Sequence, residues 1–164
     1  MAATEPRITL RAVGGGVFRI HDTFTLRAPL AVVYAVVADF ERYPEFINDV
    51  VTARSDGETC AMTLRVGPMR IPLTTRVDLV PGRTVRFALL DGPVTRLEGC
   101  WTFCQDGDAV TVDLDAEVDA GALGAWMARV AGQFADRHLQ KVRTAFSDRI
   151  AALAGWAGDT ARSR

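Results

Sequence analysis

The sequence predicts an α+β protein in which a curved antiparallel sheet wraps around one long C-terminal helix. Two observations carry this prediction. Residues Ala122–Leu153 repeat apolar side chains at steps of three and four, the spacing of a helix with one apolar face. Residues 50–119 instead alternate apolar and polar side chains between regular turn signals, which indicates an antiparallel meander. The apolar face of the sheet therefore has to cover the apolar stripe of the helix.

The predicted helix Ala122–Leu153 is about 45 Å long, at roughly 1.5 Å per residue. Asp119 is its expected N-cap, and Gly155 stands where a left-handed C-cap is expected. Gly124 and Gly132 interrupt the helix, each at a cost of about 1 kcal/mol relative to Ala. Another segment is therefore expected to approach closely there, or the helix is expected to bend. The apolar stripe consists of Leu123, Trp126, Met127, Val130, Phe134, Val142, Phe146, Ile150 and Leu153.

One strand and two short helices are expected before the meander. The strand follows Gly14-Gly15-Gly16, a turn or bulge that lacks the Lys-Ser/Thr pair of a phosphate-binding loop. Pro29 begins a short helix over Leu30–Phe40, because proline suits the first helical turn. Pro44 then disfavours helical angles at Tyr43, so the segment continues as a turn and a second short helix.

The meander itself contains six alternating runs with turn signals between them. The runs cover residues 50–54, 59–66, 69–79, 85–89, 97–103 and 110–118. The turn signals are Asp56-Gly57, Gly67-Pro68, Pro81-Gly82, Asp91-Gly92-Pro93 and Asp106-Gly107. One face of this sheet is almost wholly apolar, and the other carries Arg, Thr, Asp and Glu.

Composition narrows the class of protein. A chain of 164 residues predicts one domain, with a core over about residues 16–155 and flexible ends. Hydrophobic residues make up 49% of the chain, but no run reaches the roughly 18 residues of a membrane span, and the start lacks a signal-peptide core. We therefore expect a cytoplasmic protein. Nineteen basic against twenty acidic residues argue against DNA or other nucleic acid as a partner.

No catalytic set emerges from the residues. The acids Asp113, Asp115 and Glu117 alternate along one strand, so they point off the apolar face and form a solvated surface. The sequence places no base near the three cysteines, Cys60, Cys100 and Cys104, whose spacing is not that of a metal site. His21 falls on the outer phase of its strand and His138 on the helix stripe, and two histidines without a matched carboxylate make a poor metal site. We expect no catalytic residue, no metal and no cofactor.

The predicted interior is hydrophobic with very few inward polar groups, of which His138, Thr75 and Asp22 are candidates. Such an interior is typical of a site for an apolar ligand. The alternative is an interior packed solid with side chains.

Two motifs carry a resemblance to a known family. Val36–Phe46 resembles the V-x-D-x-x-x-Y-P-x-F segment of the START-like helix-grip superfamily. Asp91–Phe103 resembles D-G-P-F-x-x-L-x-G-x-W-x-F of its coenzyme Q-binding branch, with Val94 in place of the usual Phe. The Ala145-Phe146-x-x-Arg149 end of the last helix is similar too. This branch also includes ribosome-association toxins and lies near the polyketide cyclases.

The resemblance implies a helix-grip (START/Bet v 1-like) fold that encloses a hydrophobic tunnel. It also implies non-enzymatic binding or chaperoning of a hydrophobic small molecule, such as a polyprenyl quinone (ubiquinone) or a similar lipid, with peripheral contact at the inner membrane as a further expectation. One alternative is an enzyme like the polyketide aromatase/cyclases, in which inner polar groups shuttle protons. Another is a toxin-like protein that acts through a ribosomal partner, which Arg129, Arg137, Lys141 and Arg143 on the long helix could contact.

The predicted lining of the tunnel comes from four strands and the long helix. It consists of Met62, Leu64, Leu73, Thr75, Phe87, Leu89, Leu97, Trp101, Trp126, Val130, Phe134 and His138. Of these, Trp101 is expected to stack on a quinone ring. His138 lies four residues after Phe134 and four before Val142, so it is expected on the buried stripe, bonded either to a backbone carbonyl or to a ligand carbonyl.

Overall fold

The computed structural model describes the backbone of residues 7–162 and the side chains of residues 11–129 and 140–155. Its strands are β1 (Arg7–Gly14), β2 (Val17–Arg27), β3 (Val50–Ser55), β4 (Thr59–Val66), β5 (Met69–Val80), β6 (Thr84–Asp91), β7 (Arg96–Asp106) and β8 (Ala109–Asp119). Its helices are α1 (Leu30–Ala38), the 3₁₀ turn η1 (Phe40–Arg42), α2 (Tyr43–Phe46), the 3₁₀ turn η2 (Gly121–Leu123) and α3 (Gly124–Arg162).

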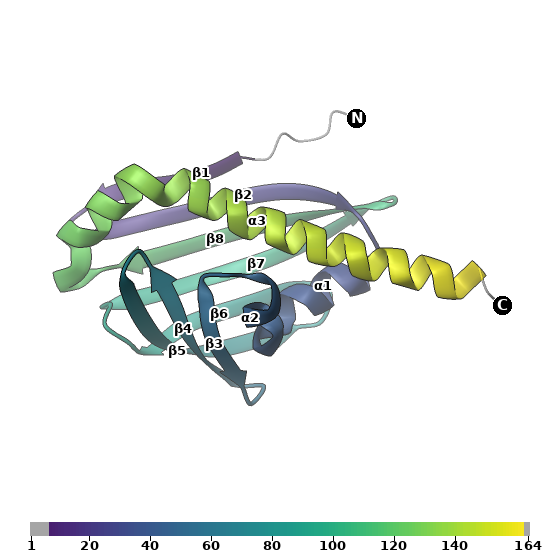
Figure 1. Cartoon of the computed structure of the whole chain (residues 1–164), viewed down its shortest axis with the longest axis horizontal. Helices are drawn as coiled ribbons and strands as arrows, with labels where there is room; N and C mark the ends of the chain where they lie inside the picture. The colour runs from purple at the N-terminus through teal and green to yellow at the C-terminus, as the bar shows by residue number, and fades with distance from the viewer. Residues whose placement is uncertain (1–6, 163–164) are drawn as a thin grey trace.

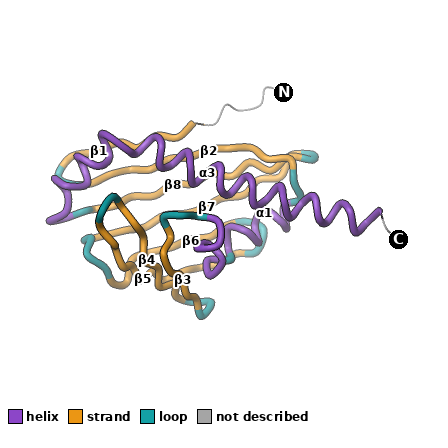
Figure 2. The backbone as a smooth tube through the Cα atoms, in the orientation of Figure 1, coloured by secondary structure: helices purple, strands orange, loops and turns teal. Residues whose placement is uncertain are grey.

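The strands form one antiparallel sheet in the order β1-β2-β8-β7-β6-β5-β4-β3. In Figure 1 the long helix α3 runs across one face of this sheet, and its C-terminal end extends past the strands. The short helices α1 and α2 lie under the same helix, and Figure 2 shows the loops gathered at the two ends of the sheet. The predicted curved sheet around a long C-terminal helix is therefore confirmed.

The first strand of the sheet was not predicted. β1 pairs antiparallel with β2 across the turn Gly14–Gly16, so the two short helices follow the second strand and not the first. Residues 7–12 alternate in the same way as the other strands, with Ile8, Leu10 and Ala12 in one phase. This alternating pattern is present but short. It lies close to the N-terminus, where flexible chain was expected, and so no strand was predicted there.

The long helix begins and ends later than predicted. Gly155 lies inside α3, which continues to Arg162, so it is not a C-cap. Asp119 ends β8 and is not the N-cap of α3; its Oδ1 accepts a hydrogen bond from the backbone N–H of Gly121 at 3.0 Å, in a local turn that leads into η2. The close approach expected at Gly124 is real, because a Cβ there would lie 3.1 Å from the Cα of Gly16. Gly132 lies in the part of α3 for which only the backbone is described, so the close approach expected there stays a prediction.

The buried core is concentrated where α1 and α2 meet the C-terminal half of α3. Phe146 and Ile150 of α3 are 2% and 1% exposed, and they pack in one cluster with residues of α1, α2 and the sheet. Buried members of this cluster include Val33, Val37, Tyr43, Val85, Val110 and Val112. The protein is thus closed and tightly packed at this end.

Candidate functional site

The predicted lining residues on the sheet all lie on the face that α3 covers, and none of them is fully buried. The half-buried ones are Met62, Leu64, Leu73, Thr75, Phe87, Leu89, Leu97 and Trp101, together with Trp126 on α3. Val130, Phe134 and His138 lie outside the described side chains, so their roles stay predictions. The inner face at these strands therefore differs from the sealed core beside α1 and α2.

Strand register brings these residues side by side. Met62 of β4 lies opposite Leu73 of β5, and Thr75 of β5 lies opposite Leu89 of β6. Trp101 of β7 lies opposite Val85 on one side and Leu114 on the other. Residues that are far apart in the sequence thus form one continuous apolar surface.

Two glycines of the resemblance motifs make room for lining side chains. A Cβ on Gly99 would lie 2.3 Å from Cζ of Phe87, so the phenyl ring occupies the space directly over this glycine. A Cβ on Gly92 would lie 2.8 Å from Cδ2 of Leu73 and 3.2 Å from Cδ1 of Leu89. The D-G-P and L-x-G-x-W motifs therefore shape the inner face of the sheet.

The aromatic motif around Tyr43 closes the opposite end. The buried hydroxyl of Tyr43 donates a hydrogen bond to the carbonyl of Val37, and burial holds the pKa of this hydroxyl well above its ordinary value. Its ring contacts the ring of Phe146 edge to face, with the centroids 5.3 Å apart. Outside this layer, Arg149 of α3 donates to Glu45 at 2.9 Å and lies over the ring of Phe46. These motif residues attach α3 to α2, which is a structural role.

One buried ion pair joins α3 to the inner face of the sheet. Asp22, on the inner phase of β2, accepts a hydrogen bond from Nη2 of Arg143, and the two side chains are 10% and 14% exposed. The guanidinium lies 5.9 Å from the centroid of the Phe24 ring. Placing Arg143 among the helix residues that face a partner was therefore wrong, because it points into the protein.

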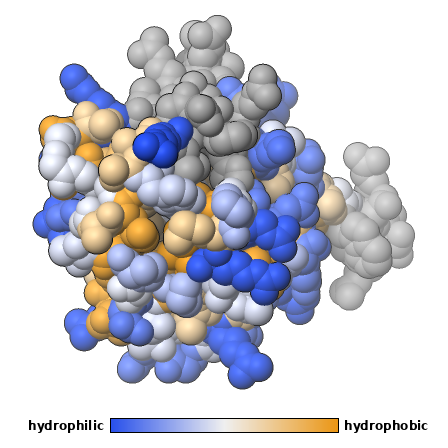
Figure 3. Space-filling view, turned by 60° about the vertical axis from the view of Figure 1, so that its left-hand side comes forward, coloured by the Kyte–Doolittle hydropathy of each residue, from blue (hydrophilic) through white to orange (hydrophobic). Residues whose placement is uncertain are grey.

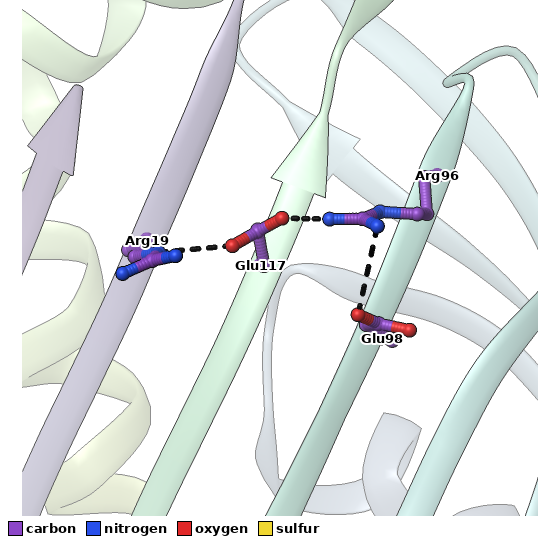
Figure 4. Close-up of polar contacts among 4 residues, drawn as sticks. All are labelled: Arg19, Arg96, Glu98 and Glu117. Carbon is purple, nitrogen blue, oxygen red and sulfur yellow. Dashed lines mark hydrogen bonds and ion pairs between the residues drawn. The ribbon is translucent and has the colours of Figure 1, made fainter. Parts of the chain in front are cut away.

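The opposite, outer face of the sheet carries the acids that the sequence placed there. Figure 4 shows Glu117 of β8 between two arginines, Arg19 of β2 and Arg96 of β7, and Arg96 also reaches Glu98. The distance from Arg19 Nε to Glu117 Oε2 is 2.9 Å. These charges compensate one another across three strands, as expected for a solvated surface.

Further polar contacts occupy the same outer face. Nδ1 of His21 lies 2.7 Å from Oδ1 of Asp115, and Thr23 donates to Asp113 at 2.5 Å.

An open hollow of about 700 Å³ is bordered by many of these charged side chains, and Phe87 is the one predicted lining residue that borders it. A smaller hollow of about 370 Å³ lies between the glycine turn after β1 and the start of α3, where glycine and alanine form most of its wall.

The three cysteines differ in their surroundings, and only Cys60 is buried. Burial, with a smaller contribution from the carboxylate of Glu41, raises the pKa of the Cys60 thiol to about 11, so it is protonated at neutral pH. Cys100 is half-buried on the outer phase of β7, and Cys104 is exposed there. Within the described part of the chain, no three His, Cys, Asp or Glu residues cluster as metal ligands.

The end of the molecule where α3 begins carries exposed apolar side chains. Val13, beside the glycine turn, is 55% exposed, and Leu90 at the end of β6 is 49% exposed. Figure 3 brings this end forward and shows apolar side chains in the middle of the face with hydrophilic ones around them. None of the helices that the structure describes is long and apolar enough to cross a membrane.

Comparison with known proteins agrees with this architecture. The sequence profile described as polyketide cyclase/dehydrase and lipid transport matches residues 26–147, which is most of the chain. The chain belongs to this family. The match begins at the end of β2 and ends within α3, so it includes strands β3–β8, both short helices and Arg143, whereas β1, most of β2 and Asp22 lie outside it.

One sequence relative and two solved structures with the same fold are similar to this chain. The ribosome association toxin RatA of Pseudomonas aeruginosa is 32% identical over 111 residues, which is 63% of this chain and 77% of RatA. The Zhui aromatase/cyclase of Streptomyces sp. R1128 has the same fold, with a TM-score of 0.69 at 19% identity over 82% of this chain and 94% of Zhui. A STAR-related lipid transfer protein of Xanthomonas axonopodis gives a TM-score of 0.68 at 17% identity over 92% and 96% of the two chains.

These comparisons confirm the START-like helix-grip fold. The family combines lipid transport and polyketide cyclisation in one architecture, and the structural relatives include a protein named for each. This family binds hydrophobic small molecules, which is the level of function that the comparisons support.

Proposed function

We propose that this protein binds a hydrophobic small molecule, a polyprenyl quinone or a similar lipid, between the inner face of the sheet and α3. It carries this molecule without changing it chemically. The proposal assigns the lining to the inner residues of β4–β7 together with Trp126, Val130, Phe134 and His138 of α3. A carrier of this kind exchanges its ligand at a membrane surface, so peripheral membrane contact from the cytoplasm forms part of the proposal.

The incomplete burial of the inner-face residues carries the proposal. Leu73, Leu89 and Leu97 lie on the face toward α3, yet they are not buried as Val85 and Phe146 are. Large apolar side chains that remain accessible on an inner face are favourable ligand contacts, because a bound apolar molecule removes this surface from water. At about 25 cal/mol per Å² of apolar surface, covering several such side chains contributes several kcal/mol to binding.

Mass spectrometry of organic extracts from the purified protein tests the proposal. A quinone or another lipid recovered in stoichiometric amount supports it, and a polyketide favours the aromatase/cyclase-like alternative. That alternative needs a proton-transferring group inside. The two polar candidates among the described inner residues are already engaged in contacts within the protein. Asp22 is paired with Arg143, and the hydroxyl of Thr75 donates to the carbonyl of Cys60 at 3.5 Å.

A second candidate function is action through a ribosomal partner, as the name of the relative RatA indicates for that protein. The observation that favours it is the 32% identity to RatA, which is higher than the identity to the structural relatives described above. Arg129 and Lys141 are exposed on α3 and remain available for such contact, whereas Arg143 is not. Co-sedimentation of the purified protein with ribosomal subunits tests this function, and an Arg129→Glu/Lys141→Glu variant should lose the association.

A further inference from the structure

The ion pair between Asp22 and Arg143 lies beside the predicted lining of the interior. Across the sheet, Asp22 of β2 lies opposite Leu114 of β8, and Leu114 lies opposite Trp101 of β7. One turn after Arg143 on α3, the ring of Phe146 contacts the ring of Trp101, with 5.6 Å between the centroids. The charged pair therefore belongs to the same inner row as the tryptophan that is proposed to contact the ligand.

The guanidinium of Arg143 is only partly satisfied. Arginine carries five N–H donors, and the acceptor that the structure gives Arg143 is one oxygen of Asp22. Its Nε is buried and has no hydrogen-bond partner. Phe24 lies against the guanidinium, as its 5.9 Å distance from the ring centroid shows. A buried donor without an acceptor costs free energy, and an oxygen atom that reaches it recovers this cost.

The charge of the pair restricts which oxygen can bind. Asp22 already neutralises Arg143, so a second carboxylate at this position would be repelled by Asp22 and would have to displace it. A neutral acceptor, such as a ketone, quinone or ester carbonyl, adds a hydrogen bond without adding charge.

We propose that Arg143, oriented by Asp22, is a polar anchor for the ligand, and that the protein selects hydrophobic molecules bearing a neutral carbonyl oxygen over hydrocarbons and fatty-acid-like carboxylates. This inference rests on the proposed ligand-binding function and names the chemical class that the site takes.

Three probes with the same aromatic body test the anchor: 2-methyl-1,4-naphthoquinone, 2-methylnaphthalene and 2-naphthoate. Equilibrium dialysis against the whole protein should show the naphthoquinone binding about tenfold more tightly than the other two. An Asp22→Leu/Arg143→Met double variant removes both charges together, so that neither is left buried alone. It should bind the hydrocarbon about as well as the parent protein and lose the preference for the quinone.

Two more variants complete the experiment. Arg143→Lys keeps the charge beside Asp22 but lacks the guanidinium fork, and it should reduce the preference at least fivefold even if the double variant does not fold. Arg129→Met changes an exposed arginine of the same helix and should leave the preference unchanged. Equal binding of the three probes by the parent protein, or a preference that survives in Arg143→Lys, overturns the anchor alone. Failure of all three probes to bind overturns the proposed function together with the anchor.

Discussion

The phenyl ring of Phe87 on β6 lies directly over Gly99 on β7, where a side chain of any size would meet it. Residue 87 pairs with residue 99 across the two strands, and a Cβ on Gly99 would be 2.3 Å from Cζ of the ring and 2.9 Å from both Cε atoms. Glycine at this position lets a large side chain of one strand lie flat against the next strand. The motif glycine therefore sets the shape of the inner face.

Replacing Gly99 with alanine should destabilise the protein by about 1–2 kcal/mol, because the added methyl group forces the Phe87 ring out of its place. Urea denaturation measures this change. In a Phe87→Leu background the same replacement should cost clearly less, which gives a coupling between the two positions.

Gly155→Ala is the matched control, since nothing lies within 4 Å of a Cβ there and the residue is inside α3. It should stabilise the protein by up to about 1 kcal/mol. Equal losses of stability in the parent and Phe87→Leu backgrounds would show that the ring is not the cause.

The six strands of the meander could be predicted because alternation and turn residues are local signals, whereas β1 and the pairing of β2 with β8 were not predicted. Each of the six runs between residues 50 and 119 became a strand whose ends lie within a few residues of the prediction. The end of α3 could not be predicted in this way. Gly155 is a favourable C-cap, but its cost inside a helix is only about 1 kcal/mol, which a continuing helix can absorb.

The buried pair of Asp22 and Arg143 was missed for a different reason. Arg143 lies at the border between the apolar stripe and the polar face of the helix. At such a border, helical periodicity alone places a charged residue on the solvent side. The signal that could have revealed it is a combination of two positions. Asp22 occupies the inner phase of β2 between Ile20 and Phe24, and Arg143 lies three residues before Phe146. A buried carboxylate is stable only with a buried positive partner. Because the two residues are far apart in the sequence, neither segment alone predicts this pairing.

At the closed end, the buried hydroxyl of Tyr43 should contribute more to stability than the more exposed ion pair of Glu45 and Arg149. Tyr43→Phe removes a buried hydroxyl that donates to the carbonyl of Val37 and leaves this acceptor without its partner, so the free energy of unfolding should fall by about 1–2 kcal/mol. Glu45 and Arg149 have side chains that are 48% and 30% exposed. Removing this pair by Glu45→Gln should cost less than about 1 kcal/mol. Thermal or urea unfolding of the two variants gives the order, and the reverse order would mean that the surface pair holds α3 in place.

Stability should fall in alkaline solution because of Cys60. Its pKa is about 11 in the folded protein against an ordinary value of 9.0, so the unfolded chain loses this proton first as the pH rises. Between these values the unfolded chain binds fewer protons than the folded protein, and the free energy of unfolding decreases with pH. The stabilisation is fully present below about pH 9 and is lost as the pH approaches 11.

Urea denaturation at pH 8 and pH 10 measures this contribution. The parent protein should lose about 1 kcal/mol more over this interval than a Cys60→Ala variant, whatever the variant costs at neutral pH. Cys104→Ala removes an exposed thiol of the same protein and should follow the parent. A Cys60→Ala variant with the same pH dependence as the parent would assign the alkaline loss to other groups.

The last prediction concerns Trp101 as a ligand contact. It is half-buried on the inner face of β7, and its ring meets Phe146 at 5.6 Å between the centroids. A short-tailed quinone that enters the interior should quench tryptophan fluorescence saturably, because the quinone ring can stack on the indole. Trp101→Phe should weaken both the quenching and the affinity, by about 1 kcal/mol or roughly fivefold in Kd. Thr111→Ala is the control on the neighbouring strand, where Oγ1 of Thr111 lies 3.1 Å from Oγ1 of Thr25 on the outer face, and it should change neither quantity. If both variants bind the quinone as the parent protein does, then Trp101 does not line the binding site, and the ligand has to be sought elsewhere on the molecule.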